Sequence, residues 1–101
     1  LENKIIAYLA GSYIGQVNYR LEKNLAQVDN MFVLPDYRDQ GVGSGLLKEF
    51  YDWCAELDVE KIIVEVSQNN EIAKEFYSKN NFKGHSVILE KRLKPVKGEV
   101  K

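Results

Sequence analysis

A glycine-rich segment in the middle of the chain constrains its fold more than any other feature. Residues 33–46 run from an apolar strand end through Pro35 to three glycines at alternate positions, Gly41, Gly43 and Gly45. Because glycine has no Cβ, a ligand can approach the backbone closely there, and the unpaired N–H groups at the start of a following helix favour negative charge. The segment predicts a strand, a turn that binds a diphosphate, and a helix. A plain strand-to-helix turn, with glycine for geometry only, stays open as the alternative.

Two common phosphate-binding motifs do not fit this segment. A Walker loop requires Gly-Lys followed by Ser or Thr, whereas this chain has Ser44-Gly45-Leu46. The dinucleotide fingerprint places its third glycine three positions after the second, and Gly45 lies only two positions after Gly43. A nucleotide-binding domain is therefore disfavoured.

The hydrophobic pattern predicts strands on both sides of this segment. The expected strand regions are 5–20, 26–34, 61–66 and 86–93. The first is predicted as a hairpin that turns at Gly11-Ser12, and the second has a break in alternation near Asp29-Asn30 that could mark a bulge before Pro35 ends it. The third is nearly continuous in apolar residues, as expected for a central strand covered on both faces.

Two further segments have the apolar spacing of amphipathic helices. Apolar residues recur at intervals of three and four over 43–57 and again over 69–80. The second helix is predicted to close at Asn80-Asn81, because asparagine tolerates a left-handed backbone at a helix end. The order strands, helix, strand, helix, strand predicts an α/β fold with a mixed, largely antiparallel sheet flanked by helices.

Composition excludes several classes of protein. A chain of 101 residues with 45% hydrophobic residues forms one domain, and no apolar run approaches the ~20 residues of a membrane span. A net charge of −1 gives no footprint for nucleic-acid binding. One cysteine, Cys54, and one histidine, His85, provide neither a disulfide nor a metal-ligand cluster, which favours a cytoplasmic protein without a metal.

The glycine-rich segment resembles the pyrophosphate loop of the GNAT acetyltransferases. The family pattern is Arg or Gln, two residues, Gly, one residue, then Gly or Ala, after a strand that ends near a proline. Arg38-x-x-Gly41-x-Gly43 follows this pattern.

A second family motif follows the loop at a suitable distance. It consists of an asparagine, an alanine and an aromatic pair, which this chain has as Asn70-x-x-Ala73-x-x-Phe76-Tyr77. At the next predicted strand Asn81 replaces the usual glycine. The resemblance covers about residues 5–93 and implies a GNAT-type core over 1–93 with a polar tail over 94–101.

The resemblance implies acetyl-CoA as cosubstrate and assigns its binding residues. Loop backbone N–H groups would hold the pyrophosphate, the strand before the loop would pair with the pantetheine arm, and an N–H near Leu34 would face the thioester carbonyl. Asn70 would contact the coenzyme, although it suits a helix cap equally well. The residues so implied are Phe32, Val33, Leu34, Arg38, Gln40, Gly41, Val42, Gly43, Ser44 and Asn70.

Two residues are implied as catalytic. Tyr77 stands where many family members keep a tyrosine that protonates the departing thiolate, and its alternative role is packing beside Phe76. Glu65 is the charged residue of an apolar run, and it resembles the base of the family branch that acetylates protein N-termini. A strand-rim role for Glu65 remains open, and Gln27 and Asp29 are competing positions.

The function expected from the resemblance is transfer of an acetyl group to an amine by direct attack on the thioester. The alternative is a catalytically silent acyl-CoA binding module. The acceptor, a small-molecule or peptide amine, has no readable signature, and no nucleic acid or membrane partner is expected. The family's first strand and two helices have no counterpart before residue 5, which predicts either a partial chain or a homodimer that covers the exposed face.

Overall fold

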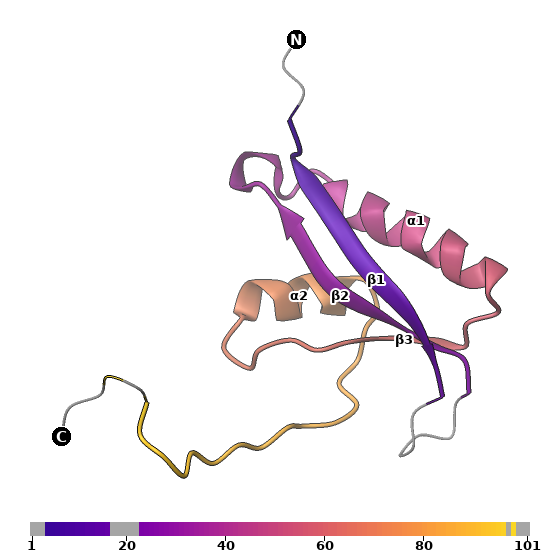
Figure 1. Ribbon diagram of the computed structural model, residues 1–101. Helices are drawn as coiled ribbons and strands as arrows, with labels where there is room; N and C mark the ends of the chain where they lie inside the picture. Colours follow the sequence, from indigo (N-terminus) through magenta and orange to yellow (C-terminus); the bar gives the residue numbers. More distant parts are fainter. Residues whose placement is uncertain (1–3, 17–22, 97, 99–101) are drawn as a thin grey trace.

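The described part of the chain forms three strands and two α-helices. The computed structural model describes residues 4–16, 23–96 and 98 (Figure 1). Its elements in chain order are β1 (Ala7–Gly15), β2 (Leu25–Val33), a short 3-10 helix η1 (Pro35–Tyr37), α1 (Val42–Glu56), β3 (Lys61–Val64) and α2 (Glu71–Lys79). Both predicted helices are confirmed within a few residues of their expected ends.

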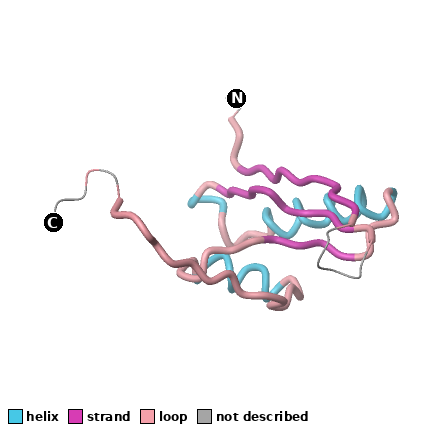
Figure 2. Tube along the Cα trace, turned by 60° about the horizontal axis from the view of Figure 1, so that its bottom comes forward, coloured by secondary structure: helices cyan, strands magenta, loops and turns pink. Residues whose placement is uncertain are grey.

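The strands form a mixed sheet, as predicted, and their order is β1-β2-β3. β1 and β2 are antiparallel, whereas β2 and β3 are parallel and pair from Leu25 opposite Lys61 to Val28 opposite Val64. Figure 2 shows the three strands side by side, with α1 along the sheet and α2 beyond β3. β2 is therefore the central strand, and it continues past the end of its pairing with β3.

The predicted hairpin within 5–20 is wrong, because β1 runs without a turn through Gly11-Ser12. The glycine has a packing role instead. A Cβ at Gly11 would lie 2.7 Å from Cζ of Phe50 and 2.9 Å from the carbonyl oxygen of Gln27. Glycine at this position lets the Phe50 ring of α1 lie directly on the strand. The end of the predicted hairpin, residues 17–20, lies outside the described residues.

The predicted bulge in β2 is confirmed. Ala10 is paired with Asn30 and Gly11 with Val28, so Asp29 is the extra residue on β2. An extra residue bends a strand and redirects its side chains. β2 ends at Val33, before Pro35 as expected, and Pro35 begins η1, which was not predicted.

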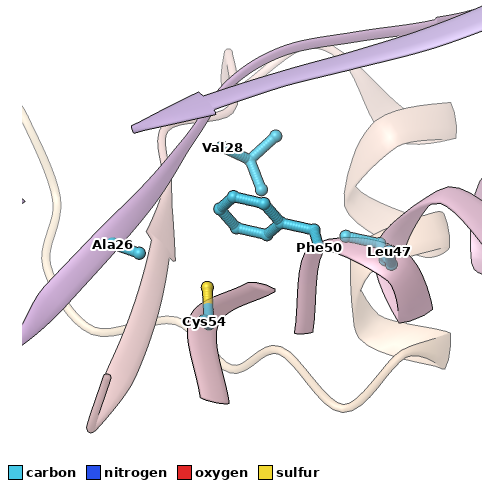
Figure 3. Close-up of a cluster of buried hydrophobic side chains, with 5 residues drawn as sticks. All are labelled: Ala26, Val28, Leu47, Phe50 and Cys54. Carbon is cyan, nitrogen blue, oxygen red and sulfur yellow. The ribbon is translucent and has the colours of Figure 1, made fainter. Parts of the chain in front are cut away.

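Most buried side chains come from β2 and α1. Figure 3 shows Phe50 directed from α1 toward Val28 of β2, with Ala26, Leu47 and Cys54 around it. Leu47, Phe50 and Cys54 recur at intervals of three and four, so they lie on one face of α1. This cluster anchors α1, and with it the loop that precedes α1, to the central strand.

The strand predicted over 86–93 is not formed. Residues 83–93 carry neither helix nor strand and are exposed, and Figure 1 shows this part of the chain running away from the sheet. A strand needs a neighbour to satisfy its backbone groups, and no described strand lies beside this segment. The prediction that 61–66 is a central strand covered on both faces is wrong, because β3 is the marginal strand of the order β1-β2-β3. β3 is also shorter than predicted, and its residues are only partly covered.

Candidate functional site

The start of α1 presents a row of backbone N–H groups. Gly41 caps the helix in a left-handed conformation with φ of 83°, which only glycine adopts without strain. The first bond closing the helix runs from the Gly45 N–H to the Gly41 oxygen at 2.9 Å. Within the described part of the chain, the N–H groups of residues 40–44 donate no hydrogen bond. Five neighbouring donors at a helix N-terminus form a site suited to an anion.

Arg38 and Gln40 fix the loop that leads into this row. The Arg38 Nε donates to the Val33 oxygen at 2.8 Å, and its guanidinium lies 5.8 Å from the centre of the Phe32 ring. The Gln40 side-chain amide donates to the Asp36 oxygen at 2.9 Å. The first turn of α1 contains no acidic residue. Arg38 and Gln40 therefore hold the loop in a fixed shape, and no carboxylate of α1 opposes an anion at the helix start.

The three glycines of the loop do different things. A Cβ would meet no atom within 4 Å at Gly41 or at Gly45, whereas at Gly43 it would lie 3.0 Å from the Phe76 ring. Gly43 is thus where α1 packs against α2. The sequence leaves both ligand access and plain geometry open for the loop glycines, and at Gly43 packing favours glycine in any case, because a side chain there would displace Phe76.

The edge of β2 that faces away from β1 is open near the loop. The Leu34 N–H donates to the Ile6 oxygen at 2.7 Å, so Leu34 cannot supply the predicted donor to a thioester carbonyl. Along antiparallel strands, every second residue directs its backbone N–H and carbonyl groups at the partner strand. Because Leu34 is bonded to β1, Phe32, opposite Tyr8, also directs its backbone groups at β1. The backbone groups of Met31 and Val33 therefore point to the open edge. Sequence reasoning missed Met31, because only the pairing with β1 reveals which residues alternate outward.

A hollow of roughly 170 Å³ lies where β2 and the chain after β3 separate. It brings together Glu65, Asn70 and Tyr77, all predicted from sequence, with Asp29 at the bulge of β2. The full lining is Val28, Asp29, Asn30, Met31, Val64, Glu65, Val66, Ser67, Asn70, Ala73 and Tyr77. The open edge of β2 thus leads from the loop into a pocket with titratable groups.

Tyr77 has the packing role considered from sequence, and it also lines the hollow. It is buried on α2, with its ring 5.2 Å from that of Phe76 and 5.3 Å from that of Phe82, both edge to face. Burial raises the pKa of Tyr77 above its ordinary 10.0, and the neighbouring Tyr51 raises it further. The phenol therefore keeps its proton at neutral pH, as a proton donor must.

The two carboxylates of the pocket differ in their surroundings. Glu65 follows the last residue of β3 and is exposed, so the premise that it is a buried charge within a strand is wrong. Asp29 accepts hydrogen bonds on both oxygens, from Ser12 Oγ at 2.8 Å and from Gln27 Nε2 at 2.8 Å. Gln27 does not line the hollow, but it holds Asp29 in place.

Asn70 caps α2. Its side-chain oxygen accepts from the Ala73 N–H at 3.0 Å, which satisfies one of the free donors at the helix start. The capping role considered from sequence is therefore confirmed, and the residue lines the hollow as well.

Neither a metal site nor a membrane span is found in the described residues. No three His, Cys, Asp or Glu side chains within 4–16, 23–96 and 98 lie close enough to hold a metal ion. Among the described helices, none combines the length and the apolar character needed to cross a membrane.

Known proteins resemble this chain in sequence and in fold. It is 33% identical over 76 residues to streptothricin acetyltransferase A of Bacillus subtilis (strain 168). The aligned residues make up 74% of this chain and 44% of that protein. It is 30% identical over 83 residues to a candidate ribosomal protein bS18-alanine N-acetyltransferase of the same organism, covering 78% of this chain and 55% of that protein. The chain spans about half the length of these curated relatives.

The fold matches that of a solved enzyme. Aminoglycoside N-acetyltransferase AAC(6')-Iy in complex with CoA aligns with a TM-score of 0.78 at 20% identity, covering 89% of this chain and 68% of that chain. The acetyltransferase (GNAT) family model matches residues 1–82. This chain belongs to the GNAT acetyltransferase family.

Proposed function

We propose that residues 1–93 form the acetyl-CoA-binding and catalytic core of an N-acetyltransferase, with 94–101 as a polar tail. The proposal is supported by three features that adjoin one another in the structure. Free N–H groups over 40–44 adjoin the open edge of β2, and that edge leads to the hollow beside Tyr77. A ligand with a diphosphate at one end, an amide-containing arm and a reactive thioester at the other matches this order of sites.

The backbone provides most of the contacts to the coenzyme in this proposal. The N–H groups of 40–44 bind the pyrophosphate, and Arg38 adds positive charge beside them. The outward N–H and carbonyl of Met31 and the outward N–H of Val33, whose carbonyl already accepts from Arg38, pair with the pantetheine amides as a neighbouring strand would. One of these two N–H groups then faces the thioester oxygen, where a donor is worth about 3 to 4 kcal/mol of the barrier. Acetyl-CoA supplies an acetyl group already activated as a thioester.

The pocket residues move the protons. As the amine nitrogen bonds to the carbonyl carbon and the carbon–sulfur bond breaks, a carboxylate takes the proton that the amine loses. Tyr77 donates its hydroxyl proton to the departing sulfur, whose ordinary pKa of about 8.5 lies below that of the phenol. We assign the base to Glu65, which is free to move toward the acceptor, and keep Asp29 as the competing position.

The acceptor is proposed as a small-molecule or peptide amine. The relatives carry names for streptothricin, aminoglycosides and a protein alanine, and all of these are amines. The base matters most for a basic acceptor. At pH 7 a lysine-like amine costs about 4.6 kcal/mol to deprotonate, and an α-amine costs about 1.4 kcal/mol.

A matched pair of substitutions at Gly41 tests the coenzyme site. Both Gly41→Asp and Gly41→Asn keep a residue type that tolerates a left-handed backbone and caps a helix. The pair differs by one negative charge, placed where the structure has no atom within 4 Å. Near a diphosphate that charge should weaken acetyl-CoA binding by roughly tenfold or more relative to Gly41→Asn, and less so in high salt.

The measurements are calorimetric titration with acetyl-CoA and release of free thiol with a panel of amines. Equal affinities of the two folded variants would remove the assignment of the pyrophosphate to this loop. Binding without thiol release for any amine would favour the silent acyl-CoA binding module. Preferential binding of ATP or NAD over coenzyme A would contradict the proposal that the loop binds acetyl-CoA.

A further inference from the structure

The end of α2 rests on the beginning of α1. The Phe76 ring packs against Gly43, where a Cβ would lie 3.0 Å from two carbons of that ring. Next to this contact, Ser44 Oγ donates a long hydrogen bond of 3.4 Å to the side-chain oxygen of Asn80, the C-cap residue of α2. Gly43 and Ser44 belong to the row of free N–H groups over 40–44. These four residues, which we call the seam, join the proposed pyrophosphate loop to the helix that carries Tyr77.

The seam holds the part of α2 on which Tyr77 lies. All nine residues of α2 are described, and Tyr77 alone among them is buried. A helix with so few buried contacts opens at a low cost in free energy unless its ends are held. Phe76 meets the Tyr77 ring edge to face at 5.2 Å, and the Asn80 side-chain amide donates to the Phe76 oxygen at 2.9 Å. The place of Tyr77 at the hollow therefore depends on Phe76 and Asn80.

We propose that Phe76 and Asn80 are positioning residues, through which coenzyme binding at the loop orders α2 and places the Tyr77 hydroxyl for proton donation. This inference rests on the proposed function, because it takes the loop as the pyrophosphate site and Tyr77 as the proton donor. A diphosphate bonded to the N–H groups of 40–44 holds the first turn of α1, and the end of α2 rests on this turn. The seam thus links the anion site to the proton donor across two helices.

The seam should affect turnover more than affinity. The backbone N–H groups that bind the coenzyme remain when a seam side chain is removed, so the affinity for acetyl-CoA should change little. A misplacement of about 1 Å at the reacting groups can lower the rate about 100-fold. Simple helix capping by Asn80 is the alternative, and it predicts a loss of stability that does not depend on Tyr77.

Hydrogen exchange of the full chain, with and without coenzyme A, tests this link independently of turnover. Coenzyme A should slow exchange over 42–46 and over 75–79 in the unchanged chain. In Asn80→Ala the slowing over 42–46 should remain, whereas that over 75–79 should be lost. Slowing confined to 42–46 in the unchanged chain overturns the inference. Slowing over 75–79 that persists in Asn80→Ala also overturns it, because direct contact with the coenzyme then explains the effect. No slowing in either segment overturns the proposed coenzyme site, and the inference with it.

A double-substitution cycle with Tyr77→Phe separates positioning from capping. Asn80→Ala should lower kcat by about tenfold or more in the unchanged chain. In the Tyr77→Phe background it should lower kcat by less than about twofold, because the hydroxyl through which it acts is absent. Similar losses in both backgrounds would show that Asn80 only stabilises α2 and would overturn the inference. A loss below about threefold for Tyr77→Phe by itself removes the donor role, and therefore the inference, whatever the exchange experiment shows.

Two further variants keep the test decisive if Asn80→Ala is unstable. Ser44→Ala keeps the loop N–H but removes the hydroxyl of the seam, so it should cause part of the same loss of kcat and add nothing to that of Asn80→Ala. Ser78→Ala removes a hydroxyl from an exposed residue of the same helix and should leave kcat within about twofold. A Ser44→Ala loss that adds in full to that of Asn80→Ala gives the two residues separate roles and contradicts the seam. Circular dichroism confirms that each variant is folded.

Discussion

The N-terminal half of the chain, up to Glu56, is packed very differently from the C-terminal half, residues 57–96. Of the seven buried apolar residues within 4–16, 23–96 and 98, six belong to β2 and α1, and the seventh is Tyr77. The proposed pyrophosphate loop is thus anchored on the well-packed half, whereas the proposed proton donor lies on the half with few buried contacts. Binding of the coenzyme and the chemical step should therefore respond to different substitutions.

The largest expected effect belongs to the sparsely packed half. Tyr77→Phe keeps the ring that contacts Phe76 and Phe82 but removes the hydroxyl. Turnover should fall by about 100- to 10,000-fold, the usual range for a positioned general acid, while affinity for acetyl-CoA stays nearly unchanged. Steady-state kinetics and calorimetric titration measure the two quantities separately.

The pH dependence of turnover and a control substitution at Tyr51 test the same role of Tyr77. Burial raises the pKa of Tyr77, so the loss of its proton should limit turnover only above its ordinary 10.0. Tyr51→Phe, at a residue of α1 that is 36% exposed and does not line the hollow beside Tyr77, should change turnover less than about threefold. A loss below threefold for Tyr77→Phe would make Tyr77 a packing residue and leave the donor to water.

The next effect tests the packed half. Leu47 is fully buried in the cluster between α1 and β2, so Leu47→Ala should lower the free energy of unfolding by about 2 to 5 kcal/mol. Ile72→Ala removes an equally apolar side chain from the surface of α2 and should cost within about 0.5 kcal/mol. Urea denaturation compares them, and similar losses would show that burial does not divide the two halves.

Sequence patterns predicted the elements that carry their own local signals. Both helices, the glycine loop and the bulge at Asp29 follow from apolar spacing, glycine chemistry and a break in alternation. Local signals do not place Tyr77 and Glu65 at one pocket, because these residues lie on different parts of the chain. Only the family resemblance predicted both as site residues. Local patterns indicate which secondary structure a segment favours. A segment adopts that structure where another element of the fold packs or pairs with it.

The failures all depend on contacts between distant segments. Gly11-Ser12 has the composition of a turn, but its glycine accommodates the Phe50 ring of α1. Leu34 has the right position for a backbone donor, but its N–H pairs with Ile6. Residues 86–93 have a strand pattern without a strand beside them. None of these outcomes can be derived from a window of sequence, because each is decided by a neighbour far along the chain.

The smallest expected effect tests the packing role of Gly11. In Gly11→Ala the added Cβ would approach Phe50 and the Gln27 carbonyl, so the variant should lose about 1 to 3 kcal/mol of stability. Gly45→Ala is the matched control, because it adds the same methyl group in open space within α1 and should gain up to about 1 kcal/mol.

A double-substitution cycle then identifies the clash itself. If the Phe50 ring is the obstacle, Phe50→Leu should cost less stability in the Gly11→Ala background than in the unchanged chain. The cost of the pair should therefore fall short of the sum of the two single costs by more than the ~0.5 kcal/mol expected for independent sites. Additive costs would instead place the strain at the Gln27 carbonyl, since that oxygen stays in position when the ring is replaced. Either result shows whether α1 or the neighbouring strand β2 requires glycine at this point of β1.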